Sequence, residues 1–116
     1  MWFVMIRNQV EATALAKLVI EQNFGENSEA AAFIISNICS IFNNTQSTAA
    51  MLRAAYAISE IKYNPEEAKI CSLCLANIAK NTKIATAVIL AAEQLTQNKC
   101  NPNVKMLFST IPRKAE

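Results

Sequence analysis

Four cysteines hold the most versatile chemistry in this chain, and two of them are spaced as a reactive or metal-binding pair. Cys71 and Cys74 form a Cys-x-x-Cys motif, and Cys39 and Cys100 complete the set. Such a motif supports thiol redox chemistry when it begins a helix, because the positive helix end lowers the pKa of the attacking thiol. It indicates a zinc site when a second pair of ligands has similar spacing. A small helical thiol-redox or zinc-binding protein that uses Cys71 and Cys74 is therefore one hypothesis.

The surroundings of the motif favour a structural role. Cys71 falls well inside its expected helix rather than at the helix start, and no second pair of cysteines has ligand spacing. Buried free cysteines behave as small apolar groups. The chain has no histidine, no aspartate and no glycine-rich phosphate loop, so the commonest catalytic bases and triads cannot form within it. We therefore predict a noncatalytic protein without a catalytic residue, cofactor or metal site.

Charge and hydropathy patterning point away from nucleic acid and membrane. The net charge is +2, and the lysines and arginines are scattered among glutamates rather than gathered in a stripe. The apolar opening, Met1 to Ile6, ends at Arg7 and is too short for a signal-peptide core. The longest uncharged run, Ala30 to Leu52, is interrupted by polar residues from Asn43 to Thr48. These features predict a cytoplasmic protein without a nucleic-acid or membrane partner.

The composition predicts an all-α fold, because one glycine and three prolines leave few of the turns that a β fold needs. About six helices are expected. They cover Trp2 to Asn23, Asn27 or Ser28 to Phe42, Gln46 to Lys62, Pro65 to about Lys80, Lys83 to Gln97, and a last one from Asn101-Pro102 to about Pro112.

Capping residues mark several of these boundaries. Gly25 is expected to end the first helix in the left-handed conformation, and Asn27 or Ser28 to cap the second. Thr45 is expected to cap the third. The strongest start signal is Asn64 followed by Pro65, with two glutamates in the first turn.

Apolar spacing predicts which residues face the interior. The second and fourth helices are apolar over a wide arc and are expected to be enclosed, whereas the first, third and fifth are one-sided. The predicted inward residues are Phe3, Ile6, Val10, Ala14 and Leu18 in the first helix; Met51, Ala54, Ala55, Ile58 and Ile61 in the third; Ile70, Cys71, Cys74, Leu75 and Ile78 in the fourth; and Ile84, Val88, Ala91, Ala92 and Leu95 in the fifth.

An internal repeat organises the chain. Shifting the sequence by 37 positions lays Asn27 to Tyr63 over the following copy without a gap, with identical residues at ten positions. A period of this length in helical sequence indicates stacked helix pairs. We divide the single domain into an N-terminal capping helix (1–26), a first repeat (27–63), a second repeat (64–100) and a partial repeat or C-terminal cap (101–116).

Short motifs within these copies resemble a known superfamily. The stretches 31–39 and 71–79 look like the armadillo-repeat helix that ends in a Leu-Ser-Asn-Ile-Ala type pattern, and 52–58 is similar to a helix of HEAT repeats. The period of 37 is shorter than the roughly 40–47 residues usual there. The resemblance implies a right-handed stack of antiparallel helix pairs, an armadillo/HEAT-like α-α superhelix that binds a protein or peptide.

In armadillo-like proteins the helices that correspond to the third and fifth line a groove for extended peptides, so the resemblance also implies a site. The expected partner-binding residues are Arg53, Tyr56 and Glu60, with Leu90, Glu93 and Gln97 beside them in the next copy. Arginine and aromatic residues are enriched where proteins grip their partners. The main functional prediction is thus a noncatalytic scaffold or adaptor.

The apolar N-terminal helix suggests a second contact surface. Stacked repeats need polar end units, yet the chain begins with Trp2, Phe3 and Val4 and holds about two and a half repeats. Either the first and last helices cap the stack, or a homo-oligomer or another partner forms through this end. A piece of a longer solenoid is the third alternative.

Overall fold

The structure is a computed structural model that describes residues 9–98, the side chains of residues 97 and 98 excepted. Every regular element in this range is an α-helix, so the predicted all-α class is confirmed for this part of the chain. The predicted helix from Asn101 and the first residues of the chain lie outside the described range. The helices are α2 (Gln9–Phe24), α3 (Ser28–Thr45), α4 (Thr48–Ser59), α5 (Pro65–Thr82) and α6 (Ala85–Asn98).

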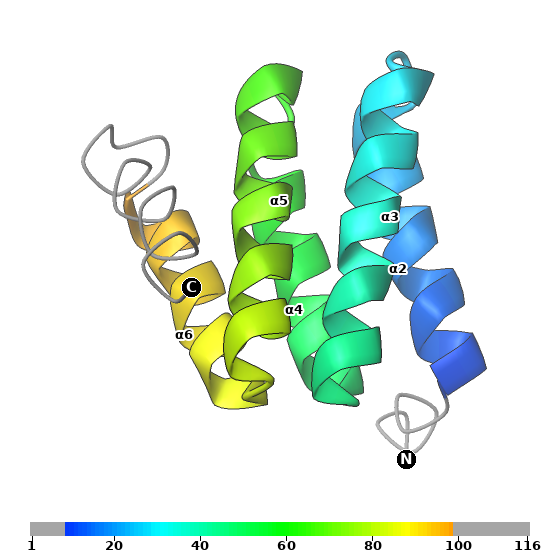
Figure 1. Ribbon diagram of the computed structural model, residues 1–116. Coiled ribbons are helices and arrows are strands. Elements are labelled where there is room, and N and C mark those ends of the chain that lie inside the picture. The colour runs from blue at the N-terminus through cyan, green and yellow to red at the C-terminus, as the bar shows by residue number, and fades with distance from the viewer. Residues whose placement is uncertain (1–8, 99–116) are drawn as a thin grey trace.

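These helices form two layers (Figure 1). α3 and α5 lie side by side in one layer, and α2, α4 and α6 follow one another in the other. Within its layer α4 packs on α2 and on α6, and across the layers it contacts α3 and α5. α4 is therefore the central helix of the described part.

α3 and α5 begin in the same way, 37 residues apart. Asn27 Oδ1 accepts a hydrogen bond from the backbone N–H of Ala30 at 3.0 Å, and Asn64 Oδ1 accepts one from Glu67 at 3.2 Å. Each bond satisfies an N–H group that a helix start leaves without an intrahelical partner. Pro65 opens α5, where its missing N–H costs nothing. Both asparagine caps are as predicted.

The turns that follow these helices also match. Gln46 and Lys83, again 37 residues apart, adopt the left-handed conformation with φ of 57° and 58°. The hydroxyls of Thr45 and Thr82 both donate to the carbonyl four residues back, at 2.8 Å. Lys83 Nζ also donates to Asn44 Oδ1 at 3.2 Å, which joins the two turns.

The start of α4 differs from the expected one. Thr45 was expected to cap this helix, but it is the last residue of α3. Ser47 is the cap instead, and its hydroxyl accepts a hydrogen bond from the backbone N–H of Ala50 at 3.1 Å. The prediction was wrong because a threonine hydroxyl can also donate back into the preceding turn of its own helix.

Gly25 ends α2 as predicted, but for a different reason. Its φ is not positive, so the left-handed conformation expected there is not adopted. A Cβ atom at this position would lie 2.8 Å from the backbone oxygen of Glu21. The glycine is therefore required by a close approach of the chain to the last turn of α2, not by its conformational freedom.

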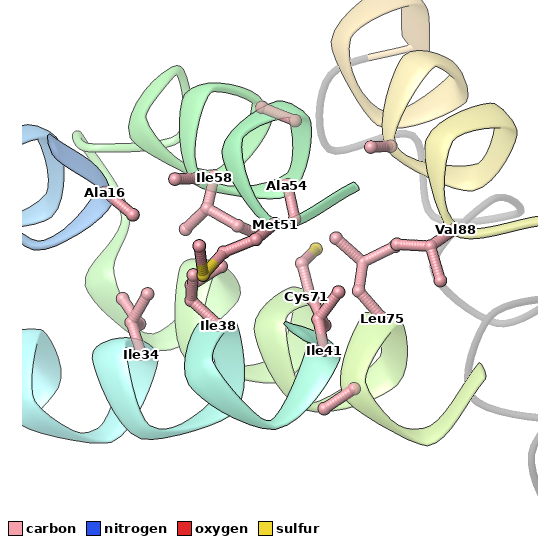
Figure 2. Packing of buried hydrophobic residues seen from close by; sticks show 14 of the residues in the cluster. Ala16, Ile34, Ile38, Ile41, Met51, Ala54, Ile58, Cys71, Leu75 and Val88 are labelled. Carbon is pink, nitrogen blue, oxygen red and sulfur yellow. The ribbon is translucent and has the colours of Figure 1, made fainter. Parts of the chain in front are cut away.

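The core lies between the layers (Figure 2). Met51, Ala54 and Ile58 of α4 point towards Ile38 of α3 and Leu75 of α5. The predicted inward residues that are buried are Met51, Ala54, Ala55, Ile58 and Ile61 around α4; Cys71, Cys74, Leu75 and Ile78 of α5; and Val88, Ala91, Ala92 and Leu95 of α6. Ile70 and Ile84 were also expected inside, but they are 42% and 54% exposed. Ile84 precedes the first residue of α6, and Ile70 corresponds to the exposed Phe33 of α3.

Alanines form a buried ridge on each helix of the α2/α4/α6 layer. Two alanines and a larger aliphatic residue recur at spacings of four, which places them in one row along a helix. Because these side chains are small, neighbouring helices can approach closely. The rows are Ala12, Ala16 and Ile20; Ala50, Ala54 and Ile58; and Ala87, Ala91 and Leu95, of which all but Ala87 are buried.

The predicted inward face of the first helix is wrong for the described residues. Val10, Ala14 and Leu18 are exposed, Val10 at 75%, whereas the alanine ridge at Ala12 and Ala16 is buried. Both stripes have helical period, so periodicity alone cannot separate them. α4 packs on the stripe with the smaller side chains. The other two predicted residues, Phe3 and Ile6, lie outside the described range.

The second helix of the prediction, α3, is not enclosed as expected. Its buried side carries Ile34, Ile38 and Ile41, while Phe33 on the opposite side is 39% exposed. No described helix covers that side. α4 has neighbours in both layers, but its outer side is exposed at Arg53 and Tyr56, as its one-sided pattern predicted.

Candidate binding surface

The predicted partner-binding residues lie along the solvent side of α4 and α6. Arg53 and Tyr56 of α4 are exposed, and so is Glu60, which follows the last residue of α4. Leu90 of α6 is 62% exposed. Glu93, also in α6, is partly exposed, and the side chain of Gln97 lies outside the described set. The role of these residues in binding stays a prediction.

An ion pair links the two helices. Arg53 Nη2 lies 3.5 Å from Glu93 Oε2, and the two side chains are 54% and 41% exposed. Arg53 was expected beside Leu90, so its side chain reaches about one helical turn further along α6. An exposed pair of this kind contributes about 0–1 kcal/mol to stability. It orients the two side chains more than it holds the helices together.

Leu18 of α2 joins this surface, although the sequence pattern placed it in the core. The hydroxyl of Thr13 contacts the sulfur of Met51 at 4.0 Å, which sets the register between α2 and α4. Leu18 follows Thr13 by five residues, and Tyr56 follows Met51 by five. Because α2 and α4 run in the same direction (Figure 1), the two side chains lie at the same level along their helices and on the same side of the layer. Leu18 is 49% and Tyr56 47% exposed.

Together these residues define what we call the outward face. Leu18, Tyr56 and Leu90 give each helix of the layer one large, well exposed apolar side chain. Polar and charged groups surround them, a pattern typical of interaction surfaces. The outward face comprises Glu11, Leu18 and Gln22 of α2; Ala49, Arg53, Tyr56 and Glu60 of α4 and its end; and Thr86, Leu90 and Glu93 of α6.

A smaller apolar group lies on the α3/α5 layer. Phe33, Ile70 and Leu73 are each about 40% exposed. Lys69 lies over the Phe33 ring, with its Nζ 5.7 Å from the ring centroid, and also 3.6 Å from a carboxylate oxygen of Glu66. The aliphatic part of the lysine thus covers some of the apolar surface while its charged end stays in solvent. The contact of the ammonium group with the ring is a cation–π interaction, which is modestly stabilising at an exposed site.

Sequence reasoning missed both Leu18 and the α3/α5 group. A signal for each was present. Ala12, Ala16 and Ile20 match Ala50, Ala54 and Ile58 at a shift of 38, which identifies the buried ridge of α2 and leaves Leu18 outside. Phe33 and Ile70 are 37 residues apart and therefore occupy equivalent positions. The second signal was missed because both helices are apolar over a wide arc, and such an arc predicts that a helix is enclosed rather than exposed on one side.

The cysteines lie mostly in the interior. Cys71 and Cys74 are 2% and 6% exposed, and Cys71 points into the core beside Ile41 (Figure 2). By the shift of 37, Cys71 is the equivalent of Ile34, another core residue. Within residues 9–98 no group of three potential metal ligands is found. Cys39 is partly exposed, and Cys100 lies outside the described range.

The outer edge of α2 is apolar and hollowed. A cavity of about 370 Å³ is lined by Val10, Thr13, Ala14 and Lys17, together with Gln9. The predicted self-association through the N-terminal helix would use this edge, and it stays a prediction. No described helix is both long and apolar enough to span a bilayer.

Comparison of the chain with protein-family models, with curated proteins and with solved structures finds no match.

Proposed function

We propose that this chain is a noncatalytic helical-repeat adaptor whose outward face binds an extended segment of another protein. The proposal includes a finer description of the fold, a right-handed armadillo/HEAT-like stack in which α3–α4 and α5–α6 are successive repeats. The recurrence of helix starts and turns at a spacing of 37 residues supports it.

One observation carries the binding proposal. Leu18, Tyr56 and Leu90 are about half exposed or more, and they come from three successive helices of one layer. Packed helices lie about 8–10 Å apart, which is about three residues of extended chain. A segment that crosses the layer would therefore meet one apolar side chain at each helix. The Arg53–Glu93 pair between them offers polar contacts to its backbone.

The thiol alternative gains no support from the described residues. Cys71 and Cys74 are buried among apolar side chains, and neither begins a helix. A reactive thiol needs exposure and a neighbouring positive charge or helix start. The proposal therefore assigns the two cysteines to the core.

A selection from a random peptide library on the intact immobilised protein tests the proposal. The affinities of the selected peptides are then measured against Tyr56→Ala and Leu90→Ala variants. Each variant should lose affinity by about fivefold or more, because truncation of a central interface side chain costs more than 1 kcal/mol. Both side chains are exposed, so neither change should disturb folding.

Leu73→Ala is the matched control, because Leu73 has similar exposure on the α3/α5 layer. It should leave the affinity unchanged. The proposal is wrong if the library yields no peptide that depends on Tyr56 or Leu90, or if Leu73→Ala weakens binding as much as they do.

A further inference from the structure

The outer edge of α2 is the side of this helix that faces away from α4 (Figure 1). Arg53 of α4 reaches α6, and Ala55, two residues later, lies about 200° further around the helix, so Ala55 faces α2. At the shift of 38, Lys17 corresponds to Ala55 and Glu21 to Ser59. Ala55 is fully buried, whereas Lys17 and Glu21 are exposed. The outer edge thus carries two opposite charges in the row where a further helix would pack.

A hollow beside Glu21 has a lining that suits a lysine side chain. It has a volume of about 340 Å³ and lies between the second half of α2 and the first half of α3. Its lining is mostly apolar and includes one carboxylate and one hydroxyl: Glu21, Gly25, Ser28, Ala31, Ala32 and Ile35. A lysine combines an apolar stem with a cationic end, so it matches this lining.

The charges near this hollow leave Lys17 and Glu21 as the pair to consider. Within the described part of the chain, neither takes part in an ion pair. Glu26 lines a different hollow together with Lys62. Glu29 does not line the hollow beside Glu21, and its place in the first turn of α3 offsets the positive end of that helix.

These two charges determine how a second copy of the chain can pair with the edge. If two α2 helices lie side by side in the same direction, their Lys17 side chains meet and repel each other. If they run in opposite directions and cross midway between Lys17 and Glu21, each lysine meets the glutamate of the other copy. A contact of this kind is isologous, because symmetry repeats it. An alanine ridge such as Ala50 and Ala54 offers neither charge a partner, so packing against it would be costly.

We infer that two copies of this chain associate through the outer edge of α2, with the two helices antiparallel and Lys17 of each copy in the hollow beside Glu21 of the other. Ala14 and Ala32 are small and exposed on this edge, so the two copies can approach closely. The inference goes beyond the proposed function and does not depend on it, because Tyr56 lies outside the contact.

This arrangement places the two outward faces on the same side of the dimer. An antiparallel contact between the two edges has its twofold axis perpendicular to the layer, so the rotation preserves the outward direction. The α2/α4/α6 layers of the two copies then form one layer with the two α2 helices at its centre. Combined with the proposed function, this favours a partner that carries two copies of the bound segment, because the second binding event is intramolecular.

Sedimentation velocity of the intact chain over a concentration series tests the inference. The native chain is compared with Lys17→Glu, Glu21→Lys and the double variant Lys17→Glu/Glu21→Lys. Each single reversal places like charges opposite each other twice in the contact, so it should weaken dimerisation about tenfold or more. The double variant restores opposite charges and should dimerise as the native chain does. Circular dichroism of each variant checks that the fold is retained.

Lys80→Glu is the matched control, because Lys80 is exposed near the end of α5 and the charge change is the same. It should leave dimerisation unchanged. A native chain that stays monomeric up to about 1 mM would overturn the inference. So would a dimer that the single reversals leave intact, or a double variant that does not regain dimerisation. Tyr56→Ala should dimerise as the native chain does, so a failure of peptide binding and a failure of dimerisation can be told apart.

Discussion

The helix pairs α3–α4 and α5–α6 are alike inside and different outside. In the interior, Ile38 corresponds to Leu75, Ile41 to Ile78 and Ile58 to Leu95, all buried aliphatic residues. On the outward face, Arg53 corresponds to Leu90 and Tyr56 to Glu93. Most interior positions change only in shape, because a buried polar group needs a partner. The exceptions are Glu67 and Ser72 of α5, which are buried where α3 has Ala30 and Ile35. The exterior can change in chemistry, so a partner's preference is set there.

The two pairs also differ in position. α4 lies between α2 and α6, whereas α6 has a described neighbour in its own layer on one side only. Equivalent substitutions in the two pairs should therefore have unequal effects in the core and equal effects in the turns. Pairs of variants 37 residues apart test this difference.

The largest effect is expected for truncation of the core. Ile58→Ala should lower the free energy of unfolding by about 2–5 kcal/mol, because it leaves a cavity in the centre of the molecule. Leu95→Ala, its equivalent in α6, should lie at the low end of that range, because α6 has a described neighbour in its layer on one side only and can relax into the space. Chemical denaturation of both variants measures the difference. An equal loss would show that the described core extends evenly to α6.

The alanine ridge should be sensitive to added volume. Ala54→Leu should destabilise by about 1–3 kcal/mol, because Ala54 is fully buried at a close helix contact. Ala91→Leu should cost less, since Ala91 is 9% exposed at the margin of the packing. Thermal unfolding followed by circular dichroism compares them. A larger loss at Ala91 would contradict the central position of α4.

The helix caps should respond equally. Asn27→Ala and Asn64→Ala each remove a hydrogen bond to the first turn of a helix, and each should cost about 1 kcal/mol. Asn43→Ala, on the exposed surface of α3, is the control and should change stability by less than about 0.5 kcal/mol. If the two stability losses differ by more than the measurement error, the case for equivalent helix pairs is weakened.

The left-handed turn residues should allow a small gain. Gln46→Gly and Lys83→Gly each relieve a conformation that L-residues avoid, so a stabilisation of up to about 1 kcal/mol is expected. Each change also removes a side-chain hydrogen bond of 3.2 Å, from Gln46 Nε2 to the carbonyl of Asn43 or from Lys83 Nζ to Asn44 Oδ1, so the two gains should be about equal. Asn43→Gly, inside α3, should destabilise instead. A loss of stability at both turn positions would refute this account of the turns.

The smallest response is expected from the buried thiols. In a Cys39→Ala/Cys100→Ala background, Cys71 and Cys74 should react with a thiol reagent only when the protein is unfolded. A metal chelator should leave the unfolding temperature unchanged. Fast reaction of the folded protein, or a chelator effect, would favour the thiol-redox or zinc-binding alternative over the adaptor.

Local signals predicted much of the backbone. The Asn64-Pro65 start, the Asn27 cap, the stop at Gly25 and the inward face of α4 could all be found from neighbouring residues, because capping and helical periodicity act within one or two turns. The candidate site was predicted only in part. Arg53, Tyr56 and Leu90 are exposed as their spacing requires, but their relation to Leu18 depends on how α2 packs.

The sequence by itself determined that this chain is helical and where most of its helices begin and end, because those choices depend on hydrogen bonds and backbone conformations within a few residues. Only the tertiary structure decided which of two apolar stripes on α2 is buried and which helix lies at the centre of the described part, because both depend on the shape of a neighbouring helix. The same packing leaves Leu18 on the solvent side, in line with Tyr56. It also brings Arg53 to Glu93, a contact that spacing along the chain did not predict.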